Sequence, residues 1–193
     1  KTICAWAASG RLFQTFDKAD YRKKLLQASE RCQTLAQWSK VLRRFRREMF
    51  VHIAWRDLAD LAAFQETAEK ISAVADVCID ESVNWLYQRL IETEGEPLSP
   101  AGEPLNLCVM ALGKLGGEEL NFSSDVDLLF AYESAGVTTK TRLSNEIFFT
   151  RLSQQLIQTL HARTTDGFVF RVDMRLRPYG QSGSLALSHN AMI

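Results

Sequence analysis

A cluster of helix-breaking residues divides this sequence into two parts with different hydrophobic periods. Five prolines and glycines lie between residues 95 and 104, whereas residues 11–94 contain neither amino acid. Such a cluster interrupts helices and favours turns. The sequence therefore predicts a helical region at residues 1–94, a linker at 95–104 and a second region at 105–193. The chain begins at Lys1 without a methionine and stops at Ile193 shortly after a predicted strand, so we expect a piece of a longer protein with a truncated second region.

Apolar residues before this cluster recur at steps of three and four, which is the period of an amphipathic helix. Two such series are Trp38, Leu42, Phe45, Met49 and Ile53, and Ile71, Val74, Cys78, Trp85 and Leu90. The basic run at Arg43, Arg44, Arg46 and Arg47 is interpreted as the solvated flank of such a helix, with an anion or partner site as the alternative.

The pattern after residue 104 is that of strands. Residues 105–112 form an apolar run of strand length, typical of a strand that is buried on both faces. Residues 126–132 predict a second strand, and the alternation at 168–176 predicts a third that Pro178 ends. Residues 184–188 would add a short edge strand.

One helix is predicted among these strands. Ser144 is a suitable N-cap and Glu146 falls in the first turn. Apolar residues follow at steps of four, namely Phe148, Leu152, Leu156 and Leu160. The fold class is therefore α+β, with a mixed sheet and flanking helices preceded by a helical segment.

Composition excludes several classes of protein. Lys plus Arg and Asp plus Glu both number 23, so the chain lacks the basic excess expected for nucleic-acid binding. No apolar run reaches the roughly 18 residues of a membrane helix, and no signal-peptide layout is present. The four cysteines, Cys4, Cys32, Cys78 and Cys108, form no C-x-x-C pair. We expect reduced core thiols, Cys78 and Cys108 in particular, and a cytoplasmic protein.

Three aspartates suggest a metal site. Asp125 and Asp127 are two residues apart, so in a strand they lie on one face with Cα atoms roughly 7 Å apart. Asp173, on the polar face of a neighbouring strand, would complete a cluster of oxygen ligands suited to Mg²⁺. Mutual repulsion should raise the pKa of at least one of these carboxyl groups. The alternative is that Asp125 and Asp127 are solvated residues on an exposed strand face.

A glycine pair precedes these aspartates. Gly116 and Gly117 follow a predicted strand and would let backbone N–H groups approach phosphate oxygens, with Lys114 and Ser124 adding a charge and a hydrogen bond. A simple turn is the alternative. The spacing fits neither a P-loop nor a dinucleotide-binding fingerprint.

Basic residues accompany the third aspartate on its predicted strand. Arg171 and Arg175 share the strand face of Asp173. They either pair with the carboxylates or contact phosphate, and the sequence leaves both possibilities open.

Two strings carry a resemblance to a known family. Residues 113–130 read GKLGGEELNFSSDVDLLF and residues 170–178 read FRVDMRLRP. Together they resemble the bifunctional glutamine synthetase adenylyltransferase/adenylyl-removing enzymes, members of the nucleotidyltransferase superfamily. Residues 42–49 and 53–56 are similar to the segment that precedes the first catalytic domain of that family.

The resemblance implies a function. The family attaches AMP to a tyrosine of glutamine synthetase and removes it by phosphorolysis, in two homologous halves. Residues 120–124 and 171–175 look more like the adenylyl-removing half, so removal of AMP with release of ADP is expected. Attachment of AMP from ATP, or a non-catalytic regulatory fragment of the same protein, are the alternatives.

The resemblance also implies ligands and partners. By this resemblance, Asp125, Asp127 and Asp173 would be catalytic and bind Mg²⁺. Gly116, Gly117, Lys114, Ser124 and Arg175, proposed from their chemistry above, would contact nucleotide or phosphate. Glutamine synthetase would be the protein substrate, and the PII signalling protein would act through the full-length enzyme.

Overall fold

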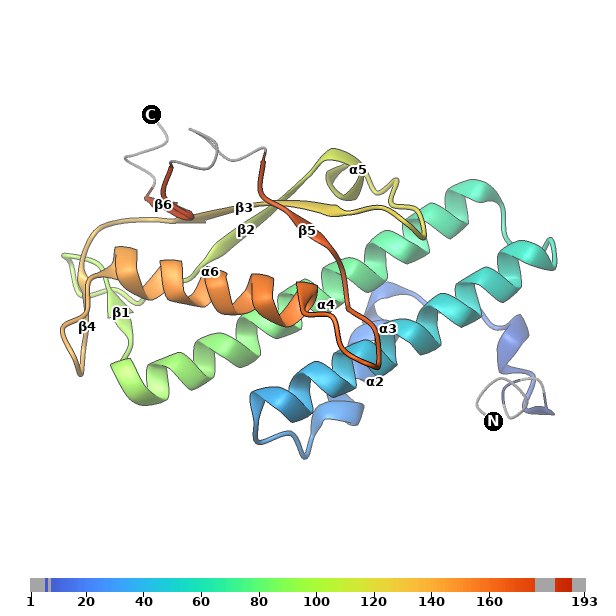
Figure 1. Ribbon diagram of the computed structural model, residues 1–193, viewed down its shortest axis with the longest axis horizontal. Coiled ribbons are helices and arrows are strands. Elements are labelled where there is room, and N and C mark those ends of the chain that lie inside the picture. Colours follow the sequence, from blue (N-terminus) through green and yellow to red (C-terminus); the bar gives the residue numbers. More distant parts are fainter. Residues whose placement is uncertain (1–5, 7, 176–182, 189–193) are drawn as a thin grey trace.

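The protein places a mixed sheet on one side of a set of long helices (Figure 1). The computed structural model describes residue 6 and residues 8–175 and 183–188. The helical elements are η1 (Arg11–Phe13), α2 (Lys18–Ser29), α3 (Leu35–Leu58), α4 (Phe64–Glu94), α5 (Gly113–Gly116) and α6 (Asn145–His161). The strands are β1 (Pro97–Leu98), β2 (Cys108–Leu112), β3 (Val126–Tyr132), β4 (Val137–Thr138), β5 (Val172–Asp173) and β6 (Ala186–Ser188). The predicted α+β class is confirmed.

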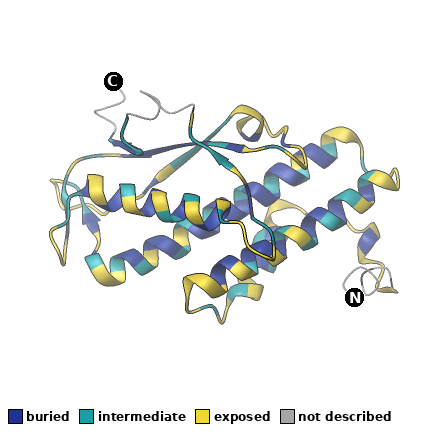
Figure 2. Cartoon of the chain, viewed as in Figure 1, coloured by how far each residue is buried: buried dark blue, intermediate teal, exposed yellow. Residues whose placement is uncertain are grey.

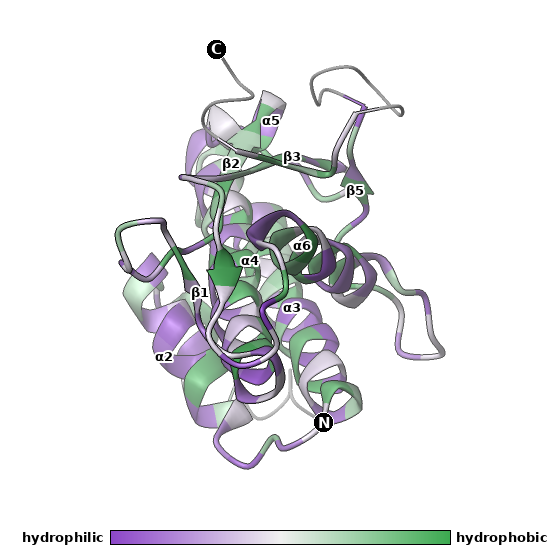
Figure 3. Cartoon of the chain, turned by 90° about the vertical axis from the view of Figure 1, so that its left-hand side faces the viewer, coloured by the Kyte–Doolittle hydropathy of each residue, from purple (hydrophilic) through white to green (hydrophobic). Residues whose placement is uncertain are grey.

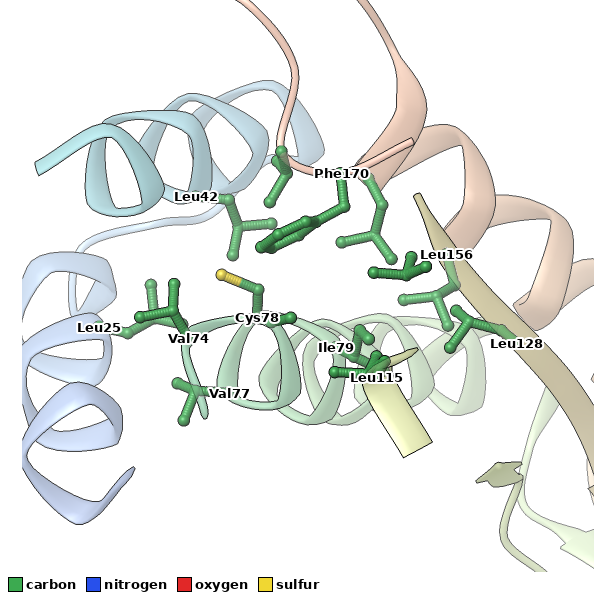
Figure 4. Close-up of a cluster of buried hydrophobic side chains, with 14 of the residues drawn as sticks. Leu25, Leu42, Val74, Val77, Cys78, Ile79, Leu115, Leu128, Leu156 and Phe170 are labelled. Carbon is green, nitrogen blue, oxygen red and sulfur yellow. The ribbon is translucent and has the colours of Figure 1, made fainter. Parts of the chain in front are cut away.

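The long helices form where the apolar period predicts them. Capping boxes start two of them: Asp17 with Asp20 at α2, and Thr34 with Gln37 at α3. The predicted apolar series on α3 is buried throughout, and in the series on α4 only Trp85 is partly rather than largely buried. Figure 4 shows side chains of several elements meeting in one core, where Leu42 and Cys78 lie near Phe170 and Val74 lies beside Leu25.

The proline- and glycine-rich segment ends α4 as predicted. Gly95 caps that helix with a φ of 85°, a conformation that favours glycine. Within the segment, Pro97–Leu98 forms β1 and pairs with β4, and the N–H of Leu105 donates to the carbonyl of Pro97 at 2.9 Å. The helices and the sheet contribute to one hydrophobic core, and the division into domains stays a prediction.

Strand β3 is the centre of the larger sheet. It pairs antiparallel with β2 on one side and parallel with β5 and β6 on the other. Its core face packs on α4 and α6: Leu128 of β3 lies near Leu156 of α6 and Ile79 of α4 (Figure 4). Figure 3 shows the same arrangement from the side, with the sheet above the helices. The predicted second strand and edge strand are confirmed.

The first predicted strand differs in its burial. Residues 108–112 form β2, but the strand is not buried on both faces, because it lies at an edge of the sheet and the helices cover only one face (Figure 2). Cys108 is exposed, so its assignment to the core is wrong, whereas Cys78 is fully buried. Cys32, Cys78 and Cys108 are free thiols, and Cys4 lies outside the described residues.

The third predicted strand is much shorter than expected. Only Val172 and Asp173 pair with β3, and the described part of 168–176 does not alternate, because Val169 and Phe170 are both buried. Both of their N–H groups donate to the carbonyl of Leu160 at 3.0 Å, so this stretch is tied to the end of α6 before it reaches the sheet. Residues 176–182 lie outside the described residues.

The helix predicted after Ser144 is confirmed. The Ser144 hydroxyl accepts the N–H of Ile147, and Phe148, Leu152, Leu156 and Leu160 are fully buried. Within the described residues, no helix combines the length and the apolar character needed to cross a bilayer.

Candidate functional site

Strand pairing brings two of the predicted aspartates together. Asp127 of β3 stands directly opposite Asp173 of β5 in the parallel register. The preceding pair, Val126 and Val172, packs toward the core, so the two aspartates lie on the other face of the sheet. The N–H of Val126 donates to the carbonyl of Arg171 at 2.9 Å and fixes this register.

The electrostatics of Asp127 reflect this crowding. Partial burial, and then the charges of Asp173 and Asp125, raise the pKa of the Asp127 carboxyl group above its usual range. The expectation that repulsion raises at least one pKa in this group is confirmed. Asp173 and Asp125 are therefore both close enough to Asp127 to disfavour its charged form.

Arginines neutralise two of the three carboxylates. The Nε of Arg171 donates to Oδ1 of Asp125, and its Nη2 donates to the carbonyl of Ser123 at 2.6 Å. The Nε of Arg175 donates to Oδ2 of Asp173 at 2.8 Å, and the backbone N–H of Arg175 donates to Oδ1 at 2.8 Å. These two bonds lower the pKa of the Asp173 carboxyl group. Of the two possibilities left open by the sequence, both arginines adopt the pairing with carboxylates.

The Asp127 carboxylate differs from its neighbours. Among the described residues it has no hydrogen bond and no ion pair. Its Oδ2 lies against Gly113, where an added Cβ would come within 2.7 Å of that oxygen. Gly113 also has a φ of 55°, which disfavours other residues. Sequence reasoning gave Gly113 no role of its own, because its contact with Asp127 arises from the pairing of β2 with β3.

The glycine pair belongs to a tight turn after β2. Gly116 ends the single turn of α5, and an added Cβ there would meet the carbonyl oxygen of Ala111 at 2.6 Å. A Cβ on Gly117 would make only ordinary contacts of 3.7 Å or more. Gly116 thus has a packing reason to be glycine, and contact of Gly116 and Gly117 with phosphate stays a prediction.

The other predicted phosphate ligands lie in the segment that joins α5 to β3 or beside it. Lys114 is exposed on α5. The hydroxyl of Ser124 donates to Oδ1 of Asn121 at 2.8 Å, and the N–H of Ser123 donates to the same oxygen at 3.1 Å. Asn121 therefore organises the turn before Asp125, and a phosphate role for Lys114 and Ser124 stays a prediction.

The helical region anchors this segment. The N–H of Leu120, a fully buried residue, donates to the hydroxyl of Ser72 on α4 at 3.1 Å, and that hydroxyl donates to the carbonyl of Ala68. Phe122 packs edge-on against Phe50 of α3 with ring centroids 5.7 Å apart. Residues 48 positions apart make the hydrogen bond, so no local pattern in the sequence announced it.

The basic run on α3 is not a solvated flank as a whole. Arg44 and Arg47 are exposed, but Arg43 is only 8% exposed, and the guanidinium of Arg46 lies 3.9 Å from the ring centre of Phe50. Arg46 also approaches the ring of Phe170, next to Arg171, so it supports the segment that leads to β5. The interpretation is corrected because residues 43 and 46 share the helix face toward that segment.

The three aspartates are the type of ligand that a divalent cation binds, but their side chains are not arranged around one cation position. Oxygen ligands from three aspartates suit Mg²⁺. Within the described ranges, however, no three acidic, histidine or cysteine side chains are placed to hold one metal ion together. Asp125 and Asp173 are turned toward Arg171 and Arg175, so a cation could share all three carboxylates only if these side chains reorient.

A family comparison and three similar proteins all point to one family. A family described as glutamate-ammonia ligase adenylyltransferase matches residues 2–193. A bifunctional glutamine synthetase adenylyltransferase/adenylyl-removing enzyme of Hahella chejuensis is 54% identical over 155 residues, which is 79% of this chain and 16% of the relative. Proteins of the same name from Pseudomonas aeruginosa and Nitrosococcus oceani are 47% and 44% identical over 96% and 95% of this chain. The chain spans 19% of the length of each of these two relatives.

Proposed function

This chain belongs to the glutamate-ammonia ligase adenylyltransferase family, and from this premise we propose that it carries the site that removes AMP from glutamine synthetase. The observation that carries the proposal is the pairing of Asp127 with Asp173 across β3 and β5, with Asp125 close enough to raise the pKa of Asp127. Acidic side chains that are brought together, with a pKa shifted by their neighbours, are typical of functional sites.

The proposed reaction is a phosphorolysis. An oxygen of inorganic phosphate attacks the α-phosphorus of the AMP–tyrosine linkage and forms the new P–O bond of ADP. The bond from that phosphorus to the tyrosine oxygen breaks, and the phenolate takes up a proton to give free tyrosine. Positioning and neutralisation of charge are the main catalytic tasks in such transfers.

Asp125, Asp127 and Asp173 are the residues we propose to hold Mg²⁺. When bound there, the ion would neutralise charge on the transferring phosphoryl group. Arg171 and Arg175 neutralise two of these carboxylates in its absence, and on release they would become available to phosphate oxygens. Lys114, Ser124 and the turn at Gly116–Gly117 would contact the nucleotide or its phosphate oxygens.

Removal rather than attachment is proposed because residues 120–124 and 171–175 resemble the adenylyl-removing half of the family. Attachment of AMP from ATP uses the same superfamily site and is the second candidate. The whole enzyme would be cytoplasmic and would respond to the PII signalling protein, both of which are part of the proposal.

The first test is Asp127→Asn in the full-length enzyme. We expect release of ADP from adenylylated glutamine synthetase to fall by about a thousandfold or more, as for loss of a charge-stabilising group, while attachment of AMP continues. Asp76→Asn is the matched control, because Asp76 pairs with Lys18 on the helices. Loss of attachment with survival of removal would assign this chain to the other activity.

A second test addresses a non-catalytic fragment. A ligand that binds only the folded state raises the unfolding midpoint, and at one hundred times its Kd it stabilises by about 2.7 kcal/mol. Mg²⁺ with ADP should raise the midpoint of the full-length wild-type enzyme more than that of Asp127→Ala. Equal responses of the two proteins would support a regulatory role for this region.

A further inference from the structure

Large apolar side chains are exposed together where α3 turns into α4. Leu58 is 84% exposed and Phe64 79%, and Trp55 lies three residues before Leu58 on the same side of α3. Phe13 of η1 is 65% exposed, and Leu61 lies between the two helices. Figure 2 shows exposed residues at this end of the helices. We call Phe13, Trp55, Leu58, Leu61 and Phe64 the α3–α4 patch.

A buried arginine fixes the backbone beneath the patch. The side chain of Arg56 is only 9% exposed. Its Nη1 donates to the carbonyl of Phe13 at 3.1 Å, and its Nη2 donates to the carbonyl of Leu61 at 2.9 Å and to Glu66 at 3.1 Å. One guanidinium therefore ties η1, the turn and the start of α4 together. Apolar side chains on a fixed backbone lose less entropy when they bind, which favours a docking surface.

The surroundings of the patch are acidic. Asp57, Asp60, Glu66 and Glu69 fall between residues 57 and 69, an interval with no lysine or arginine, and they outnumber the basic residues next to it, Arg11 of η1, Arg56 and Lys70. Only Glu66 among them has a basic partner, Arg56, in the described part of the chain. An apolar surface with an acidic rim is complementary to an apolar surface with a basic rim.

We propose that the α3–α4 patch docks an amphipathic helix of a partner protein, with apolar residues on one face and Lys or Arg along its flanks. An anionic lipid surface would be repelled by the acidic rim. A second copy of this chain related by twofold symmetry would place two acidic rims together. A basic helix meets both the apolar and the acidic parts of the surface, by the groove-type recognition that such helices use. The proposal is independent of the reaction at Asp127.

The test uses the full-length protein and two labelled 18-residue helical peptides. Both carry Leu and Phe at positions i, i+3, i+4 and i+7, and they differ only in having Lys or Glu along the flanks. Fluorescence anisotropy should show the Lys peptide binding at least about tenfold more tightly than the Glu peptide. Leu58→Ser combined with Phe64→Ser should weaken the Lys peptide by about tenfold or more.

The matched control replaces Leu26 and Leu35 by Ser, because these leucines are 45% and 39% exposed but belong to α2 and to the first turn of α3. This variant should bind the Lys peptide as the wild type does, and circular dichroism should show both double variants folded. Equal binding of the two peptides, no binding of either, or binding unaffected at residues 58 and 64 would overturn the proposal. A photo-crosslinker at residue 64 that joins another segment of the same chain would also overturn it.

Discussion

The helical region, residues 18–94, and the sheet region, residues 97–188, place their charges differently. Where helices meet, opposite charges pair. The Nζ of Lys18 lies 2.7 Å from Oδ2 of Asp76, and the Nη2 of Arg22 lies 2.8 Å from Oδ2 of Asp80. In the sheet region, strand register sets Asp127 beside Asp173, although like charges directly opposite destabilise strand pairs. Opposite charges that meet between elements add a little stability, whereas like charges brought together cost stability and mark a candidate functional site.

The two regions nevertheless share structural support. The hydroxyl of Tyr87 on α4 donates to the carbonyl of Leu105 at 2.9 Å, and the Tyr87 ring packs edge-on against Phe148 of α6. Ser72 of α4 holds the N–H of Leu120. The helical region therefore does more than precede the sheet in sequence, because it supports the segment that leads to Asp125.

Replacing Phe148 by Ala is the strongest test of this shared support. Phe148 is fully buried between Tyr87 and Phe149, so we expect a loss of about 3–5 kcal/mol in the free energy of unfolding. All four tryptophans lie within residues 1–94. Tryptophan fluorescence and circular dichroism should therefore show the same shift of the denaturation midpoint, because the two regions unfold together.

The neighbouring Ile147→Ala is the control for that variant. Ile147 is 45% exposed on the same helix, so its replacement should change stability by less than about 0.5 kcal/mol. If Phe148→Ala moves the circular dichroism midpoint and leaves the tryptophan midpoint unchanged, the comparison fails, since the regions would then unfold as separate units.

Local pattern predicted the elements that need only their own sequence. The period of α3, α4 and α6 set their buried faces, and Ser144 set the start of α6. The strand at Val126–Tyr132 was predicted with its observed bounds, because it lies at the centre of the sheet and is apolar along nearly its whole length. In the helices the apolar period indicates the buried face, whereas β3 is buried along nearly its whole length.

Features that depend on distant neighbours were not predicted. The exposure of Cys108 follows from the position of β2 at the sheet edge, and the shortness of β5 follows from the bonds of Val169 and Phe170 to Leu160. For the candidate site, the sequence indicated Asp127 and Asp173. It did not indicate Gly113 beside Asp127, which becomes visible only when β2 and β3 are paired.

A second comparison uses two buried serines of α4. The Ser82 hydroxyl accepts from Nε1 of Trp38 within the helical region, whereas the Ser72 hydroxyl accepts from the N–H of Leu120. Each Ser→Ala change leaves a buried donor without its partner and should cost about 1–3 kcal/mol. Only Ser72→Ala should speed hydrogen exchange at Leu120 and weaken Mg²⁺-dependent nucleotide binding. Similar exchange at Leu120 in both variants would show that the Ser72 bond does not order this segment.

The smallest expected effect is the change in the free energy of unfolding when one aspartate is replaced by asparagine. This change has opposite signs in the two regions. Because the pKa of Asp127 is raised in the folded state, the folded protein binds this proton more tightly than the unfolded chain does. Stability therefore falls as pH rises from near the unfolded value, about 3.9, through the raised pKa. In metal-free protein, Asp127→Asn should remove this loss and raise the free energy of unfolding at pH 7 by less than about 1 kcal/mol, as expected for a partly exposed charge.

On the helices, Asp76→Asn removes the partner of Lys18 and should lower stability at pH 7 by about 0.2–1 kcal/mol. Urea denaturation in chelator at pH 4 and pH 7 measures both differences. We expect the two changes in stability to have opposite signs at pH 7, and the gain in stability for Asp127→Asn to shrink at pH 4. This result would mean that the sheet region loses stability by keeping Asp127 charged beside Asp173. A loss of stability in both variants would mean that Arg175 compensates Asp127 as fully as Lys18 compensates Asp76, and the contrast between the two regions would no longer hold.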